Sequence, residues 1–402
     1  MKYVVVLGDG MADEPIAELG GKTPLAYAKT PMMDEMAARG EIGLAATIPA
    51  GMKPGSDTAN LAVLGYNPRL YYTGRSPLEA LSIGVNMADA DVAIRCNLVT
   101  VSDDDLPYEQ KTIIDHSSSE ISTSDAAVLI EAVRKQLEFE GYHFFVGTSY
   151  RHLLIWNHGK TVDLTPPHDI LERKIGEYLP TDPKLLLMQK RSYEILNKHP
   201  LNVARAEKGL NKANSVWFWG AGTRPFLSSF AEKTGKKGAM ISAVDLLKGI
   251  AVGAGMQVIE VEGANGGLNT NYEGKAGAAV RALTEDDYDF VYIHLEAPDE
   301  MGHQGSLERK IQSIEYLDER VVRVVKEGLD RAGVDYRILI MPDHPTPISK
   351  RTHTTAPVPY LIYDSTKTDT ITRQSYSEAE AKASGNLFSE GYRLMDHYLE
   401  IK

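Results

Sequence analysis

Residues 289–305 read DFVYIHLEAPDEMGHQG, a short apolar segment that runs directly into a turn containing Asp and His. Similar short apolar runs occur at 215–220, 238–242, 257–261 and 336–341. Apolar side chains at helical spacing fill the intervening residues 243–255, 270–285 and 306–332. Alternating strands and helices of this kind predict an α/β fold with a mostly parallel sheet and helices on both faces.

The N-terminal segment fits the same sheet. Residues 4–7 read VVVL and are followed by Gly8-Asp9-Gly10, which predicts a strand buried on both faces with Asp9 at its carboxyl end. A helix is expected at 30–40, because Thr30 can cap it, Pro31 takes the first helical position and Gly40 lies just past its end.

The middle of the chain follows a different pattern. From about 89 to 180 the apolar residues alternate in short strands around one strong helix, expected at 124–140, and a turn-rich stretch at 179–183 marks the exit. We therefore expect a smaller α+β domain at 89–180. It is inserted into a larger domain that residues 1–88 and 181–402 form together.

Composition excludes several classes of protein. The 402 residues include 43 Lys and Arg against 55 Asp and Glu, a net charge of −12 that argues against a non-specific nucleic-acid binder. The single cysteine, Cys96, excludes an internal disulfide. No run approaches the roughly 18 apolar residues of a membrane span, and the first apolar run is too short for a secretory signal. We expect a cytoplasmic protein that binds neither nucleic acid nor membrane.

Two segments near predicted strand ends carry Asp and His together. Asp299 and His303 are four residues apart, so one helical turn would point both at the same ion, although a pair that only stabilises the turn is the alternative. Asp343 and His344 follow the strand at 336–341, and His353 comes nine residues after His344. Adjacent Asp and His with a further His are typical of two-metal sites for phosphate chemistry.

Two segments nearer the N-terminus also carry candidate residues for this site. Asp9 follows the first strand, where capping of the next helix is the alternative role. Ser56 or Asp57 would begin a helix whose free N–H groups attract phosphate, or would be an ordinary N-cap. Because the carboxyl ends of strands in such a sheet line one crevice, we expect Asp9, Asp299 and Asp343 to meet there.

These motifs, with those at 95–98, 165–169 and 271–276, resemble the cofactor-independent phosphoglycerate mutases of the alkaline phosphatase superfamily. The chain length and the sequence EAPDE at 296–300 are similar to those of the shorter, archaeal-type branch of this family. The match spans nearly the whole chain. The resemblance implies an alkaline-phosphatase-like fold. It also implies an isomerase that interconverts 3-phosphoglycerate and 2-phosphoglycerate through a phosphoserine, without bisphosphoglycerate.

The resemblance also implies roles for single residues. One divalent ion would be held by Asp9, Ser56, Asp343 and His344, and a second by Asp299, His303 and His353, with Ser56 as the nucleophile. A cation and the N–H donors of a helix start would together stabilise a serine alkoxide. Asp and His ligands suit Mn²⁺, the expected ion, and also Zn²⁺, Co²⁺ or Mg²⁺.

A mutase must keep water from the phosphorylated serine while the glycerate turns over. The domain at 89–180 is the expected lid. Within it, Arg95 and Arg151 are expected to hold the substrate anions and His116 to contact the substrate, with a surface role as the alternative for each. Lys275, in the larger domain, is expected to hold the transferring phosphoryl group.

Two other functions stay open. Residues 114–120, IDHSSSE, are less basic than a phosphoglycerate enzyme would require, which favours another acceptor such as homoserine, as in a kinase-like enzyme. A non-catalytic metal-binding protein would have lost a ligand, yet Ser56 and all six Asp and His candidates are present. The expected partner is a small phosphorylated acid substrate, and the sequence predicts no oligomeric state.

Overall fold

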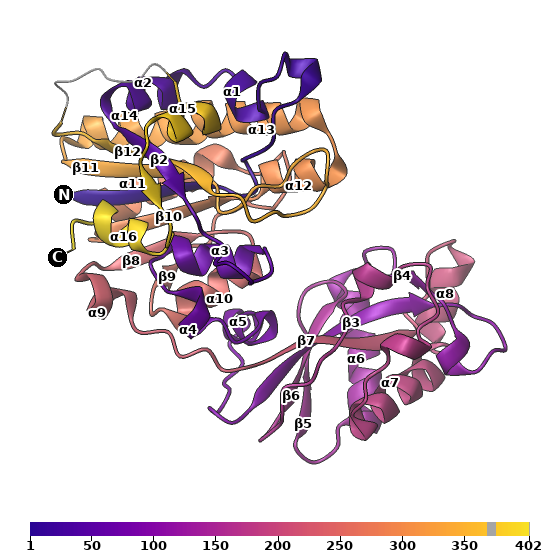
Figure 1. The fold of residues 1–402 in the computed structure, drawn as a ribbon. Helices are drawn as coiled ribbons and strands as arrows, with labels where there is room; N and C mark the ends of the chain where they lie inside the picture. The colour runs from indigo at the N-terminus through magenta and orange to yellow at the C-terminus, as the bar shows by residue number, and fades with distance from the viewer. Residues whose placement is uncertain (368–374, 402) are drawn as a thin grey trace. The chain divides into compact units, whose positions relative to one another are not determined.

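The computed structural model describes residues 1–367 and 375–401, which form two compact units. Unit 1 comprises Met1–Tyr72 and Phe226–Lys402, and unit 2 comprises Thr73–Pro225. Figure 1 shows the ribbon of each unit with most of its helices and strands labelled. None of the helices in the described part of the chain combines the length and apolar character that a bilayer crossing requires.

An eight-stranded sheet forms the centre of unit 1, in the order β13-β2-β12-β11-β1-β10-β8-β9. Its strands are β1 (Lys2–Gly8), β2 (Glu41–Ala45), β8 (Gly238–Ile241), β9 (Gln257–Val258), β10 (Phe290–Leu295), β11 (Tyr336–Met341), β12 (Val358–Asp364) and β13 (Leu387–Phe388). Strand β12 runs antiparallel to both of its neighbours, and the other pairs are parallel. The predicted mostly parallel sheet is therefore confirmed.

Helices cover both faces of this sheet, as predicted. Val4, Ile293 and Ile340 point to one face, where they share a buried core with helices that include α2 and α14. On the other face Figure 1 shows α3, α10 and α16. The helices of unit 1 are α1 (Pro24–Tyr27), α2 (Pro31–Arg39), α3 (Ser56–Val63), α4 (Pro68–Tyr71), α9 (Phe230–Thr234), α10 (Asp245–Gly253), α11 (Tyr272–Thr284), α12 (Ala297–Gln304), α13 (Leu307–Leu317), α14 (Arg323–Ala332), α15 (Glu378–Ala383) and α16 (Arg393–Tyr398).

The segment predicted as one helix at 306–332 is helical but not uniform. A π-helical turn at Asp318–Val322 separates α13 from α14. Asp318 is buried in this turn, and its carboxylate accepts hydrogen bonds from the backbone N–H groups of Met32 and Met33 at the start of α2. The carboxylate thus satisfies donors at the N-terminus of a neighbouring helix.

Unit 2 is an α+β unit built on a five-stranded antiparallel sheet. Its strands are β3 (Val92–Val101), β4 (Ile113–Asp115), β5 (Tyr142–Phe145), β6 (Arg151–Trp156) and β7 (Ser215–Thr223). Its helices are α5 (Arg75–Ser82), α6 (Thr123–Leu137), α7 (Pro183–Leu196) and α8 (Pro200–Glu207). The inserted α+β unit expected in the middle of the chain is therefore present.

The boundaries of unit 2 differ from the expected 89–180. The strand predicted at 215–220 was expected in the parallel sheet, but as β7 it pairs antiparallel with β3, with Val216 opposite Leu98. Helix α7 packs against β7, and α5 packs against both β3 and β7. These contacts bring residues 73–88 and 181–225 into unit 2.

Candidate functional site

Three neighbouring strands of unit 1 deliver the predicted Asp and His residues to one edge of the sheet. Asp9 directly follows β1, Asp343 follows β11, and Asp299 lies in α12, which begins just after β10. Strand β1 lies between β10 and β11 and is parallel to both, so the three carboxyl ends are side by side. The structure therefore brings together the three aspartates that the sequence placed at separate strand ends.

The first group of potential ligands surrounds His344. Asp9, Asp343 and His344 are buried, and each offers an atom within 4.8 Å of the others. The Nε2 atom of His344 lies 3.5 Å from Oδ1 of Asp9, 3.4 Å from Oδ2 of Asp343 and 3.1 Å from Oγ of Ser56. All four residues expected at the first ion thus converge on one point.

One oxygen in this group lacks a hydrogen-bond partner among the described residues. Oδ1 of Asp9 is buried, and no hydrogen bond from the described residues reaches it. Burial, followed by the neighbouring Asp343 and Asp299 carboxylates, raises the pKa of Asp9 well above its ordinary value. A buried carboxylate with a free oxygen beside other carboxylates is costly unless a cation compensates it, so the donor set fits a bound metal ion.

The second group contains Asp299, His303 and His353. Nε2 of His303 lies 3.2 Å from Oδ2 of Asp299 and 3.0 Å from Nε2 of His353. Burial alone would raise the pKa of Asp299, but the two histidines hold it well below its ordinary value. The hydrogen bond to Asp299 raises the pKa of His303 to about 9.

The two groups adjoin at His344. Asp299, His344 and His353 also offer ligand atoms within 4.8 Å of one another, and the rings of His344 and His353 are 3.9 Å apart between centroids. The resemblance implied that His344 binds only the first of the two ions. The observed geometry leaves His344 within reach of both groups.

Ser56 is the first residue of α3, preceded by Gly55 in an extended conformation. Asn60 lies one turn later, and its Nδ2 is 2.8 Å from both the Ser56 carbonyl oxygen and Oδ2 of Asp343. Asn60 therefore fixes the start of the helix to a predicted metal ligand. Sequence reasoning missed this residue, although its spacing of four from Ser56 placed it on the same helix face. Asp57, the alternative to Ser56, instead accepts a hydrogen bond from the Tyr72 hydroxyl.

His294 was also missed, because it appears in the sequence only as a residue of the apolar strand β10. Its ring is buried, with Nε2 2.9 Å from Oδ2 of Asp9 and Nδ1 3.2 Å from Oγ of Ser242. Burial lowers the pKa of His294 to about 3, so the ring is neutral at pH 7. Only the pairing of β10 with β1 shows that His294 lies beside Asp9.

Two buried lysines lie near these groups. Lys275 of α11 donates a hydrogen bond to the His294 carbonyl oxygen at 3.0 Å, and burial lowers its pKa to about 8. Lys310 of α13, which sequence reasoning missed, pairs with Asp13 and donates to the Thr346 carbonyl oxygen, both at 2.8 Å. The Thr346 hydroxyl in turn donates to Asp299. Lys310 thus supports the loop that contacts the second group.

The residues expected to hold the substrate lie in unit 2. Arg95 is buried in β3, pairs with Glu79 and lies over the Trp219 ring at 5.0 Å. This placement differs from the alternative of a solvated surface arginine. Burial would raise the pKa of Glu79, but Arg95 and Arg75, together with the more distant Arg151, hold it below its ordinary value.

His116 and Arg151 share a neighbour in the same unit. The ring of Tyr150 lies 5.8 Å from the His116 ring and 5.3 Å from the Arg151 guanidinium. Arg151 is exposed. The ring of His168 lies 6.2 Å from that of His116 and 5.3 Å from that of Trp219. These aromatic contacts connect the predicted substrate residues.

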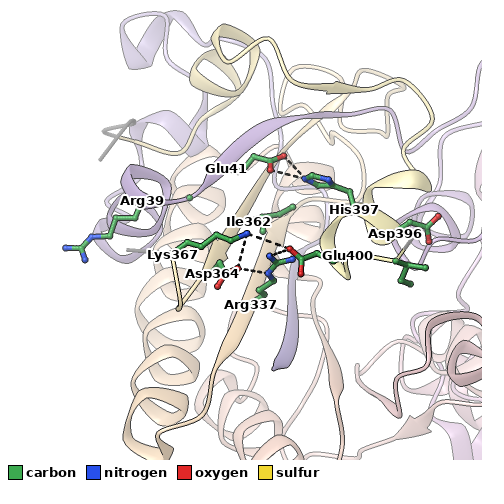
Figure 2. Close-up of a pocket in the computed structure, with 11 residues that line it drawn as sticks. Arg39, Glu41, Arg337, Ile362, Asp364, Lys367, Asp396, His397 and Glu400 are labelled. Carbon is green, nitrogen blue, oxygen red and sulfur yellow. Dashed lines mark hydrogen bonds and ion pairs between the residues drawn. The ribbon is translucent and has the colours of Figure 1, made fainter. Parts of the chain in front are cut away.

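A cavity of about 750 Å³ lies at the opposite, amino-terminal edge of the unit 1 sheet. Figure 2 shows Arg337, at the start of β11, between Asp364 and Glu400. Nε of Arg337 is 2.7 Å from Asp364, and Lys367 lies 3.5 Å from Asp364 and 3.6 Å from Glu400. These ion pairs attach the C-terminal segment to the sheet, so the charges lining the cavity stabilise one another.

Replacing Arg337 by Met is expected to destabilise the protein by about 1–3 kcal/mol, because the buried Asp364 carboxylate loses its bond from Arg337 and keeps only the longer contact with the exposed Lys367. Urea unfolding of the two proteins measures this difference. The matched control is Arg393→Met, which breaks an exposed pair with Glu390 and should cost less than about 1 kcal/mol. Equal losses in the two variants would contradict a structural role for the Arg337 pair.

Comparison with known proteins gives consistent matches. A family model described as 2,3-bisphosphoglycerate-independent phosphoglycerate mutase matches residues 37–202. A protein of Geobacter sulfurreducens, named as a probable enzyme of this kind, is 49% identical over 405 residues and covers 100% of both chains. The Methanosarcina barkeri enzyme of the same name is 50% identical over 387 residues, covering 95% of each.

Solved structures agree. A protein from Pyrococcus horikoshii is similar with a TM-score of 0.80 at 30% identity, covering 99% of this chain and 97% of that chain. The cofactor-independent phosphoglycerate mutase of Thermoplasma acidophilum is similar with a TM-score of 0.63 at 26% identity, covering 100% of both.

Proposed function

This chain belongs to the family of 2,3-bisphosphoglycerate-independent phosphoglycerate mutases, and we propose that it interconverts 3-phosphoglycerate and 2-phosphoglycerate without a bisphosphoglycerate cofactor. The observation that carries the proposal is the convergence of Ser56, Asp9 and Asp343 on Nε2 of His344. This arrangement puts a hydroxyl nucleophile beside a buried, negatively charged donor set. Such a site suits phosphoryl transfer.

The donor set fits two divalent ions. Asp9, Ser56, Asp343 and His344 would hold one, and Asp299, His303 and His353 the other, with Mn²⁺ as the expected ion. Bound ions of this kind neutralise phosphoryl oxygens and stabilise an ionised serine. The free Oδ1 of Asp9 and the short distance between the His303 and His353 nitrogens support this assignment.

Ser56 is the proposed nucleophile. Its Oγ would lose its proton and form a bond to the phosphorus while the bond between phosphorus and O3 of the glycerate breaks and O3 takes up a proton. The O2 hydroxyl of the reoriented glycerate would then lose its proton and form a bond to the phosphorus as the bond between phosphorus and Oγ breaks, and Oγ of Ser56 would regain a proton. Asn60 holds the backbone at Ser56, so the nucleophile starts from a fixed position.

The substrate anions need cationic partners, and we propose Arg95, Arg151 and His116 of unit 2 and Lys275 of unit 1 for this role. Glu79 orients the Arg95 side chain, whose planar guanidinium suits a carboxylate or phosphate. Unit 2 would act as the lid that retains the glycerate and excludes water while the phosphoserine exists.

The names of the relatives favour phosphoglycerate over the alternative acceptor, homoserine. The presence of Ser56 with all six candidate Asp and His residues likewise argues against a non-catalytic metal-binding protein. The substrate would therefore be a small phosphorylated acid.

A ³¹P NMR time course of the full chain with 3-phosphoglycerate and Mn²⁺, without bisphosphoglycerate, tests the proposal. We expect 2-phosphoglycerate to appear and an EDTA control to remain unchanged. Accumulation of inorganic phosphate instead would indicate a phosphatase and contradict the lid. Phosphorylation of homoserine from a nucleotide donor, with no conversion of phosphoglycerate, would contradict the proposed substrate.

A further inference from the structure

Ser242, His294 and Asp9 form a row of hydrogen bonds across three adjacent strands of unit 1. Strand β10 lies between β1 and β8, with Leu7 opposite His294 and Ile293 opposite Ile241. This register places Ser242, just after β8, beside His294. All three side chains are buried. Neither Ser242 nor His294 has a part in the mechanism proposed above.

An ionised Asp9 carboxylate only accepts hydrogen bonds, and this fixes the direction of the bonds in the row. The backbone N–H of Val244 donates to Oγ of Ser242 at 3.0 Å, and the Ser242 hydroxyl donates to Nδ1 of His294 at 3.2 Å. A neutral imidazole that accepts at Nδ1 carries its proton on Nε2. That Nε2–H then donates to Oδ2 of Asp9 at 2.9 Å.

The consequence is that the two oxygens of Asp9 differ. Oδ2 is occupied by His294, whereas Oδ1 is buried without a hydrogen-bond partner among the described residues and lies 3.5 Å from Nε2 of His344. Any other orientation of the carboxylate plane would break the bond between His294 and one of its oxygens. Oδ1 is therefore the oxygen that faces the remaining donors.

We propose that Ser242 and His294 are positioning residues that hold Asp9 so that Oδ1 alone is presented to a divalent cation. The inference rests on the proposed function, because it assumes that the Asp9 group binds a metal. Ser242 and His294 would act only through Asp9. Hydrogen bonds to metal ligands from such outer residues change metal affinity by about 10- to 100-fold.

Direct Mn²⁺ binding to the full chain without substrate tests the proposal, with free Mn²⁺ measured by electron paramagnetic resonance. We expect His294→Leu to raise the Kd for Mn²⁺ by about 10- to 100-fold. Ser242→Ala should raise it by a smaller factor, because Nε2–H remains but its orientation is no longer fixed. His294→Gln should bind more tightly than His294→Leu, since its amide N–H can still donate to Asp9.

The matched control is Ser192→Ala in unit 2. The Ser192 hydroxyl is also buried, accepts from a backbone N–H and donates to a neighbouring acceptor, but it is not part of the row. This variant should keep the wild-type Kd for Mn²⁺. The melting temperature of each metal-free protein separates a loss of fold stability from a loss of metal affinity.

A wild-type Kd in His294→Leu would overturn the inference. If that variant does not fold, Ser242→Ala decides: weaker Mn²⁺ binding supports the inference, and an unchanged Kd overturns it. A wild-type chain that does not bind Mn²⁺ would overturn the metal centre itself and the inference with it. A wild-type chain that binds Mn²⁺ and isomerises phosphoglycerate, beside a His294→Leu variant that binds Mn²⁺ equally well, would overturn the inference alone.

Discussion

Replacing Ser56 by Ala is expected to abolish isomerisation, with a loss in kcat of at least about 10⁴-fold, the scale seen when a nucleophile is removed. The proposed reaction passes through a bond between Oγ of Ser56 and phosphorus, and alanine offers no atom for that bond. Asp9, Asp343 and His344 remain, so the variant should still bind Mn²⁺. The ³¹P NMR time course and an Mn²⁺ titration measure the two quantities separately.

The matched control for this loss is Ser229→Ala. Ser229 also lies at the start of a helix, where its hydroxyl accepts a hydrogen bond from the Glu232 N–H at 3.4 Å, but it belongs to none of the ligand groups. This variant should retain wild-type activity. Mass spectrometry of acid-quenched wild-type enzyme should in addition detect phosphate on the peptide that contains Ser56. Isomerisation by Ser56→Ala above a few per cent of the wild-type rate would contradict the covalent mechanism.

The sequence predicted which aspartates meet at the carboxyl edge of the unit 1 sheet because local patterns determine it. Short apolar runs identify buried strands, and in a parallel sheet the residues after such strands share an edge. Asp9, Asp299 and Asp343 could therefore be placed together before any contact was known. The same reasoning located Ser56 at the start of a helix, since a helix N-terminus also has a local signature.

The features that we did not predict from the sequence depend on which strands are neighbours in the two sheets. The run at 215–220 has the composition of a parallel-sheet strand, and only its antiparallel register with β3 assigns it to unit 2. His294 and Asn60 acquire their roles from Asp9 and Asp343, which are distant in sequence. Strand and helix periodicity contains no information about such partners, so the residues that contact these two aspartates escaped prediction.

Removal of divalent metal is expected to abolish activity and to make the stability of the chain depend on pH. Without a cation, burial and the nearby carboxylates raise the pKa of Asp9 well above its ordinary value. The hydrogen bond to Asp299 raises the pKa of His303 from 6.5 to about 9. A group whose pKa is higher in the folded state stabilises the fold at low pH, and this stabilisation is lost as the pH rises through the folded value.

The melting temperature of the EDTA-treated chain should therefore fall between pH 6.5 and pH 9, although the lowered pKa of Lys275, about 8, makes the fall less steep above pH 8. The lowered pKa of Asp299 does not change the stability of the fold in that range. The stabilisation that ionised Asp299 provides is lost only as the pH falls below the ordinary range of a carboxyl group. With Mn²⁺ at about a thousand times its Kd, the folded state gains about 4 kcal/mol. Protons compete with Mn²⁺ for these side chains, so at one fixed Mn²⁺ concentration the Mn²⁺-induced rise in melting temperature should be larger at pH 9 than at pH 6.5.

The His303→Gln variant separates the contribution of His303 to the pH dependence of stability from that of Asp9, because it removes the imidazole and leaves Asp9 unchanged. Its metal-free melting temperature should fall less steeply over the same pH range than that of the wild-type chain. Activity that survives exhaustive treatment with EDTA would contradict the metal centre. If activity were lost but the metal-free melting temperature did not change with pH, the ion would be required for the reaction. It would then not compensate the buried charge of Asp9, contrary to what we expect from the fold.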